Sequence, residues 1–187
     1  RRTEGHLPVA ITMNPNDAVI DLAGYVEPLP FDAAAFDALD AEIRAGLPRE
    51  MLITPDDVRG KSRTLEAAVL NGGWPTLSEA RGKFLFVLDE GGHKREAHMA
   101  GHPSLQGRAL FANAEPGTPE AAVLIMNDPI RDGDEIARLV GLGYLVRTRA
   151  DSGAIEARQG DYTRAEAAAE SGAHFISTDY PAPHYET

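Results

Sequence analysis

The run Lys83-Phe84-Leu85-Phe86-Val87-Leu88 determines the fold class predicted for this chain. Its consecutive apolar residues fit a β-strand and leave that strand no polar face for solvent. Strands of this kind are typical of parallel sheets that are covered by helices on both faces. Other apolar runs of the same type occur at residues 7–13, 121–126, 144–146 and 174–177.

Helical patterns alternate with these runs. Between residues 31 and 47, apolar side chains recur at three- and four-residue spacings, and Asp32 can cap the first turn. The segments TLSE at 76–79 and TRAE at 163–166 match the capping box, in which a hydroxyl and a carboxylate satisfy free amides at a helix start. Residues 89–107, rich in Gly and His, are predicted to form a solvated loop. The alternation predicts an α/β fold with a parallel sheet.

Composition narrows the possible partners. The 187 residues carry a formal net charge of -11 and contain no Cys. This length suits one domain or part of a larger one, and residues 1–187 are predicted to belong to a single domain. Nucleic acid is not expected as a partner, because binding it needs a basic footprint. Cysteine nucleophiles and thiolate zinc sites are excluded. The sequence contains no run of about 20 apolar residues, so no transmembrane segment is predicted.

Polar side chains follow the predicted strands at their carboxyl ends, where parallel α/β proteins gather their reacting groups. Loops are polar in any protein, so one such residue alone carries little information. Arg147 and Arg149 carry more, because alternate residues of a strand share a face. Two guanidiniums there could bind a phosphate or hold a salt-bridge network. The strand-end candidates are Asn14, Asp89, Asn127, Arg147, Arg149 and Asp179.

Other candidates are weaker. His93, His98 and His102 lie in the predicted loop, and Gly101 and Pro103 interrupt any helix that could align the last two for a metal. Trp74 either lines a pocket or anchors the turn between Gly73 and Pro75. The chain contains no Gly-x-Ser-x-Gly elbow, Walker loop or dinucleotide-binding glycine motif.

Five motifs of the chain carry a resemblance to a known family: LITPDDVRG at 52–60, GWPTL at 73–77, RGKFLFVLD at 81–89, RTRAD at 147–151 and GAHFISTDY at 172–180. Together they resemble the bacterial calcium-dependent phosphoinositide phospholipase C family, within the PLC-like phosphodiesterase superfamily. The last motif also resembles glycerophosphodiester phosphodiesterases, which finish on a similar Thr-Asp-Tyr-Pro.

The resemblance implies a TIM-type (β/α) barrel, of which this chain would cover roughly the C-terminal half, since a full barrel takes about 250 residues. It implies phosphodiester hydrolysis by two histidines acting as general base and acid, with Ca²⁺ stabilising the phosphate charge. These histidines are expected before Arg1, so the fragment alone is expected to be inactive. The residues that match substrate-pocket positions are Asp89, Asn127, Arg147, Arg149 and Asp179, with Trp74 as a further candidate.

Asn14 is the one expected metal ligand in this chain, and it departs from the superfamily, which often places a glutamate there. An amide oxygen can bind calcium, but the loss of a carboxylate weakens the site. The expected substrate is a phosphoinositide.

Two alternatives are glycerophosphodiester hydrolysis and a non-catalytic barrel that acts as a binding or scaffold protein. A half barrel exposes strand edges, so its missing N-terminal half or another chain is an expected partner. The family further implies a secreted or periplasmic protein.

Overall fold

A computed structural model describes residues 5–153 and 155–180. The predicted α/β class is confirmed, because strands alternate with helices and all strand pairs are parallel. The described strands form two three-stranded sheets, ordered β1-β2-β3 and β4-β5-β6. They lie in two compact units, residues 1–122 and 123–187.

The first unit is built on β1 (Val9–Met13), β2 (Phe84–Leu88) and β3 (Leu110–Ala112). The KFLFVL run supplies the central strand, as the sequence predicts, and its last four residues are buried. The other elements of this unit are α1 (Ala33–Gly46), the 3₁₀ turn Arg49–Met51, α2 (Pro55–Arg59), α3 (Leu65–Val69), α4 (Leu77–Ala80), α5 (Gly92–Met99) and the 3₁₀ turn Pro103–Leu105.

One face of this sheet is covered by α1 and α5. Ile11, Phe86 and Leu110 are register partners across the three strands, so their side chains share that face. They pack in one apolar cluster with Phe36 and Ile43 of α1. The apolar side chains that recur between residues 31 and 47 therefore form the face of α1 that packs on the sheet. As predicted, Asp32 caps the helix, and its side chain accepts a hydrogen bond from the amide of Ala35.

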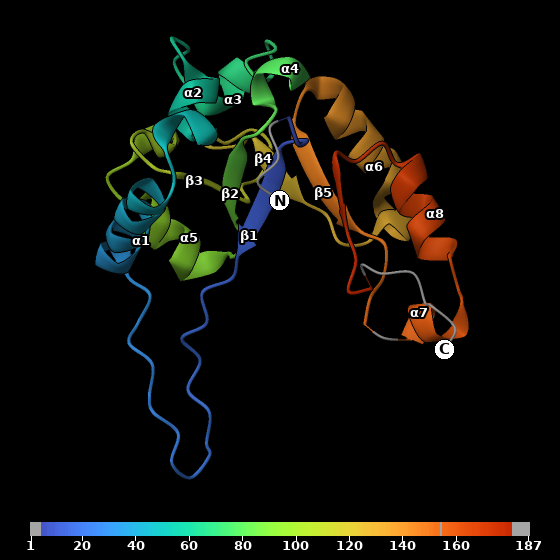
Figure 1. The fold of residues 1–187 in the computed structure, drawn as a ribbon, viewed down its shortest axis with the longest axis horizontal. Coiled ribbons are helices and arrows are strands. Elements are labelled where there is room, and N and C mark those ends of the chain that lie inside the picture. The colour runs from blue at the N-terminus through green and yellow to red at the C-terminus, as the bar shows by residue number, and fades with distance from the viewer. Residues whose placement is uncertain (1–4, 154, 181–187) are drawn as a thin grey trace. The chain divides into compact units, whose positions relative to one another are not determined.

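The two ends of this sheet differ. Figure 1 shows α2, α3 and α4 beyond the amino ends of β1 and β2. At the carboxyl end of β1, residues 15–31 extend as a long arm before the chain enters α1 (Figure 1).

The second unit contains β4 (Val123–Ile125), α6 (Pro129–Leu142), β5 (Leu145–Arg149), α7 (Ile155–Gln159), α8 (Thr163–Glu170) and β6 (Phe175–Ser177). Asp128 and Pro129 start α6, and Gly143 ends it in the left-handed conformation at φ 102°. Val146 and Thr148 of β5 are fully buried, and α6 and α8 both contact this strand.

Two local predictions are wrong. The predicted loop at 89–107 contains α5, because burial of Lys94 and His98, four residues apart, gives this short helix a face to pack. His98 therefore lies in the core and not in a solvated loop. The capping box at 163–166 does not form, because Tyr162 is the cap residue and Thr163 already lies inside α8.

Within the described residues, no helix combines the length and the apolar character needed to cross a bilayer.

Candidate functional site

Strand β5 presents its two arginines on one face. Arg147 and Arg149 alternate with Val146 and Thr148, which are buried on the opposite face. The arginine side chains are half-buried at the carboxyl end of the strand. The predicted shared face is thus present in the second unit.

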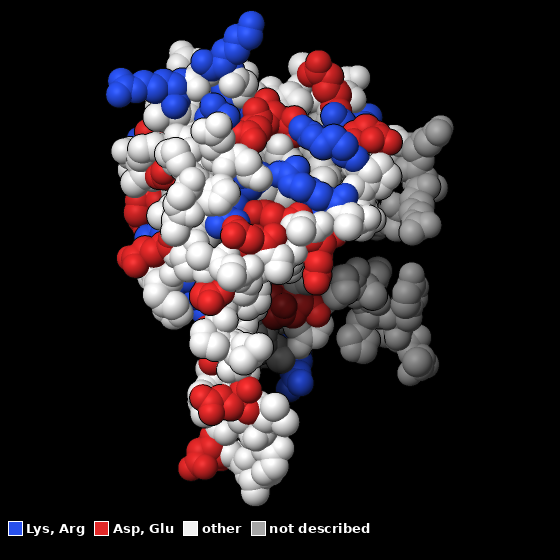
Figure 2. All heavy atoms as spheres, turned by 90° about the vertical axis from the view of Figure 1, so that its left-hand side faces the viewer, with Lys and Arg blue, Asp and Glu red and all other residues white. Residues whose placement is uncertain are grey.

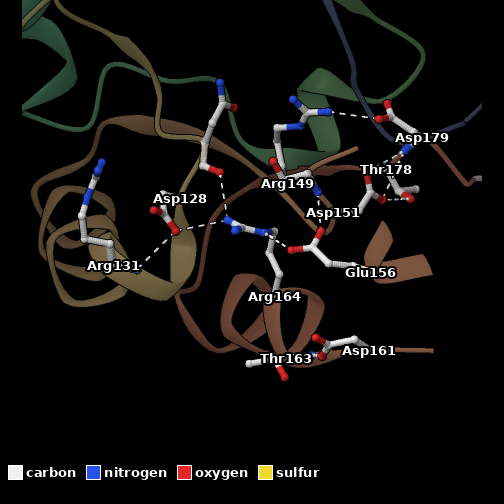
Figure 3. Close-up of polar contacts among 12 residues, drawn as sticks. Asp128, Arg131, Arg149, Asp151, Glu156, Asp161, Thr163, Arg164, Thr178 and Asp179 are labelled. Carbon is white, nitrogen blue, oxygen red and sulfur yellow. Dashed lines mark hydrogen bonds and ion pairs between the residues drawn. The ribbon is translucent and has the colours of Figure 1, made fainter. Parts of the chain in front are cut away.

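Each of these arginines reaches a residue that follows a neighbouring strand, and Figure 3 shows the contact of Arg149 with Asp179. Arg147 Nη1 donates to Oδ1 of Asn127, just after β4. Arg149 Nη2 forms an ion pair at 3.1 Å with Oδ2 of Asp179, just after β6. Four of the predicted site residues therefore come together at one sheet edge.

Asp151 organises the same edge, although it was not among the predicted site residues. Its side chain is buried and accepts hydrogen bonds from the hydroxyl of Thr178 and, at 3.1 Å, from the backbone amide of Asp179. These bonds join the end of β5 to the end of β6 (Figure 3). Its place in the RTRAD motif, after the predicted strand, was the available signal in the sequence.

A second ion-pair group lies beside this edge. Arg164 of α8 donates through Nε to Glu156 at 2.8 Å and through Nη1 to Asp128 at 3.1 Å (Figure 3). The Arg164 guanidinium and the Ser152 amide hold the pKa of Glu156 below its usual value. Sequence reasoning assigned Arg164 to a capping box, so its role as a bridge between segments was missed.

The first unit carries Asn14 and Asp89 at the corresponding edge of its own sheet. Asn14 Nδ2 donates at 2.7 Å to the backbone oxygen of Asp89, and the amide of Asp89 donates to Met13. A hollow of about 500 Å³ next to Asn14 is lined by Thr12, Phe31 and other residues of β1, the arm and α1. The two predicted residues are thus neighbours in this unit.

The donor set of this edge fits calcium only in part. Ca²⁺ takes six to eight oxygen ligands, and the side-chain oxygen of Asn14 is of the right chemical type to be one of them. Among the described residues, however, no three His, Cys, Asp or Glu side chains converge as a metal site. These residues can contribute to a calcium site but do not complete one.

Trp74 lies on the connection between α3 and α4, at the other end of the sheet. Its ring is half-buried and packs against the ring of Phe111, with centroids 5.4 Å apart. A Cβ on the preceding Gly73 would lie 2.8 Å from the backbone oxygens of Ala68 and Val58. These close contacts favour the turn-anchor interpretation of Trp74, and a substrate contact stays a prediction.

Fold and site together define a parallel α/β protein that gathers guanidinium, carboxylate and amide groups at the carboxyl ends of its strands. A family model described as "Phosphoinositide phospholipase C, Ca2+-dependent" matches residues 1–187. The chain belongs to this family, as its motifs predict.

Solved structures agree with this assignment at the level of the fold. A Ca²⁺-dependent phosphatidylinositol-specific phospholipase C from Streptomyces antibioticus is 22% identical with a TM-score of 0.63, and the match covers 94% of this chain and 65% of that one. A calcium-dependent phosphoinositol-specific phospholipase C from Pseudomonas sp. is 16% identical with a TM-score of 0.60, covering 95% of this chain and 59% of that one. The chain therefore spans less than two thirds of either enzyme. No curated protein sequence matches it.

Proposed function

We propose that the protein containing this chain is a phosphodiesterase of the phospholipase C type that cleaves phosphoinositides. The observation that carries the proposal is the family match over residues 1–187, joined to the paired arginines at a strand end. In this proposal residues 1–187 form the C-terminal part of one TIM-type barrel domain. Export to the periplasm or the medium is part of the same proposal.

The arginine edge is proposed to bind the anionic substrate. Guanidinium groups recognise phosphate oxygens through paired N–H donors, and Arg147 and Arg149 point to the same face of β5. Asn127 and Asp179 orient these arginines through the contacts described above. Asp89, at the carboxyl end of β2, is proposed as a further substrate contact from the first unit. Trp74 lies at the opposite end of that sheet and is proposed to anchor its turn.

The acid–base chemistry is proposed to come from two histidines before Arg1. One would take the proton of a substrate hydroxyl next to the phosphate, and the other would protonate the leaving alcohol. Calcium, when bound, would stabilise negative charge on the phosphate. From this chain, Asn14 is proposed to give the metal one amide oxygen. The chain alone is then expected to be inactive.

The function is tested with the full-length protein, supplied with phosphatidylinositol and, separately, with glycerophosphodiesters. Release of diacylglycerol and an inositol phosphate from phosphatidylinositol supports the proposal. Hydrolysis of water-soluble glycerophosphodiesters alone would instead place the protein with the glycerophosphodiester phosphodiesterases, whose motif at the last strand is similar. No release from either substrate would leave a non-catalytic binding or scaffold barrel.

A substitution at the arginine edge tests the assigned site. Arg149→Ala is expected to lower kcat/KM for phosphatidylinositol at least about tenfold, because one charge-assisted contact to phosphate is lost. Arg138→Ala is the matched control, since Arg138 pairs with Glu135 on the surface of α6, away from this edge. Equal kcat/KM values for the two variants would remove Arg149 from the substrate site.

A further inference from the structure

The arm at residues 15–31 is fixed at its base. Lys94 of α5 donates at 2.6 Å to the backbone oxygen of Pro15 and pairs at 3.1 Å with the carboxylate of Asp17. Asp17 also accepts from the amide of Phe31 at 2.9 Å, which closes the two ends of the arm on each other. The Phe31 amide and the Lys94 ammonium hold the pKa of Asp17 below its usual value, so the carboxylate stays charged. We call these contacts of Asp17 with Lys94 and Phe31 the clasp of the arm.

Hydrogen bonds also order the outer part of the arm. The hydroxyl of Tyr25 donates at 2.9 Å to the backbone oxygen of Ala18, across the loop. The amide of Tyr25 donates to Leu22, and that of Leu22 donates to Ile20. The arm therefore has a defined turn at its end and is held out from the unit by the clasp at its base.

The end of the arm is apolar and exposed. Val26 and Leu29 are 84% and 86% exposed, the highest values among the exposed large apolar residues of the described chain. Four more large side chains of the same short segment are also exposed, namely Val19, Ile20, Leu22 and Tyr25. Single exposed apolar residues are ordinary, but a contiguous group of this kind marks an interaction surface.

The charge of the arm limits what it can bind. No Lys or Arg occurs between residues 3 and 43, whereas Asp21 and Glu27 lie among the apolar side chains. Figure 2 shows the arm at the bottom of the view as a white surface with patches of Asp and Glu. Such a surface does not attract anionic headgroups, and it suits an electrically neutral apolar phase.

The size of the arm argues against a protein partner. Stable protein interfaces take roughly 20–30 residues from each side. The apolar segment from Val19 to Leu29 supplies far fewer, and its backbone projects from the unit as a long loop (Figure 1). A projecting segment with exposed apolar side chains can enter the headgroup and acyl boundary of a bilayer.

We propose that residues 18–29 are a docking finger that inserts into the surface of a zwitterionic phospholipid bilayer. The choice of a lipid partner rests on the proposed function, since a phosphoinositide substrate resides in such a bilayer. The arm that carries this finger follows β1 directly after Asn14, on the same sheet edge as Asp89. Insertion would therefore bring the carboxyl edge of this sheet to the membrane surface.

The test is sedimentation of the full-length protein with phosphatidylcholine vesicles that contain no phosphoinositide. The double variant Val26→Ser, Leu29→Ser is expected to bind these vesicles at least about tenfold more weakly, because its exposed apolar area is smaller. Binding by the unaltered protein is expected to persist in 1 M NaCl, because it is not electrostatic.

The matched control is Leu70→Ser, Leu77→Ser, which removes two exposed leucines of the same unit, one at the end of α3 and one at the start of α4. This control is expected to bind as the unaltered protein does. Lack of binding by the unaltered protein, or equal binding by both double variants, would overturn the proposal. So would a dimer, seen by sedimentation velocity without vesicles, that dissociates in the Val26→Ser, Leu29→Ser variant, because a second copy would then cover the finger.

Because these vesicles contain no substrate, the result is independent of turnover. Hydrolysis of a monomeric, short-chain phosphatidylinositol is expected to be equal in the unaltered protein and the finger variant. Vesicle binding without any hydrolysis would overturn the proposed function and keep the finger. Hydrolysis without vesicle binding would keep the function and overturn the finger.

Discussion

His98 is a histidine whose environment keeps it neutral. It is fully buried, and its Nε2 lies 3.1 Å from the backbone oxygen of Leu110, which can only accept, so Nε2 carries the proton. Burial, reinforced by the nearby Arg108 guanidinium, lowers the pKa of His98 to about 4. The unfolded chain, in which the pKa is about 6.5, therefore takes up a proton that the folded protein excludes.

This difference predicts a loss of stability in mild acid. As pH falls from about 6.5 to 5, protonation of His98 in the unfolded chain should lower the free energy of unfolding by about 2 kcal/mol. The cost levels off below pH 4, where the folded protein also binds the proton. The loss should be smaller in His98→Gln, which keeps a donor for Leu110, and unchanged in His93→Gln, whose residue is exposed on the same helix. Urea unfolding at pH 7 and pH 5 measures this, and equal pH dependence in all three proteins would contradict it.

The close backbone contacts of Gly73 predict that a side chain at this position is destabilising. Gly73→Ala is expected to cost about 1–3 kcal/mol, because the added Cβ meets two backbone oxygens that belong to packed helices. Trp74 is the sole Trp of the chain, so its fluorescence reports the displacement of the turn directly. Gly46→Ala, at the open end of α1, has no atom within 4 Å of its new Cβ and should leave both stability and emission nearly unchanged. An unchanged emission in Gly73→Ala would argue against an anchored turn.

The sequence could identify polar strand ends but not all of their contacts. Alternation along β5 was enough to place Arg147 and Arg149 on one face, since a strand fixes its side chains with a period of two. Their partners follow other strands and depend on register, which one sequence does not specify. Arg164 joins Asp128 and Glu156 only through the tertiary packing of α8. For that reason the ion-pair group could not be predicted.

Helix α1 is held to the first sheet by a buried ion pair as well as by its apolar face. Arg108 is 1% exposed and donates through Nη1 to Asp40 at 2.8 Å and to Asp37 at 2.6 Å. Asp40 also accepts from the amide of Ala109 at 2.7 Å, next to β3. The two carboxylates share one guanidinium but differ in burial, with side-chain exposures of 11% for Asp40 and 65% for Asp37.

This difference predicts unequal effects of the same substitution. Asp40→Ala should lower the free energy of unfolding by about 3 kcal/mol, since it removes the buried carboxylate that pairs with the Arg108 guanidinium and accepts from the Ala109 amide. Asp37→Ala should cost less than about 1 kcal/mol, because solvent screens that pair. Urea denaturation of both variants tests this. A larger loss in Asp37→Ala than in Asp40→Ala would mean that burial does not set the strength of this contact.

Secondary structure was predictable where the local pattern and the tertiary packing agree. The strand predicted at 83–88 forms as Phe84–Leu88, and the helix predicted at 31–47 forms as Ala33–Gly46. The capping box at Thr76 is also present. Helix α5 was not predicted, because the pair Gly91 and Gly92 is typical of a loop. The helix is stabilised by the burial of Lys94 and His98 against residues distant in the sequence, which the local pattern does not show. The box at Thr163 failed because α8 begins earlier than its motif predicts.

The metal requirement concerns the molecule as a whole. A calcium ion needs six to eight oxygens, and in the described residues the proposed contribution is the single amide oxygen of Asn14. A neutral ligand in place of a carboxylate lowers the charge of the site, and ligand charge is one determinant of calcium affinity. The full-length protein is therefore expected to need calcium for hydrolysis but to bind it weakly.

Calcium titration of hydrolysis by the full-length protein tests this expectation. Asn14→Ala should raise the half-maximal calcium concentration about tenfold, because one oxygen ligand is lost, whereas Asn14→Asp should lower it by adding a charge. Asn71→Ala and Asn71→Asp are matched controls, since Asn71 caps the end of α3 by donating to Ala67, remote from the carboxyl edge. If Asn14→Asp and Asn14→Ala shift the titration equally, the residue acts through its hydrogen bond to Asp89 and not through the metal. If neither variant shifts the titration, Asn14 is not a ligand, and all of the calcium ligands must be sought elsewhere in the protein.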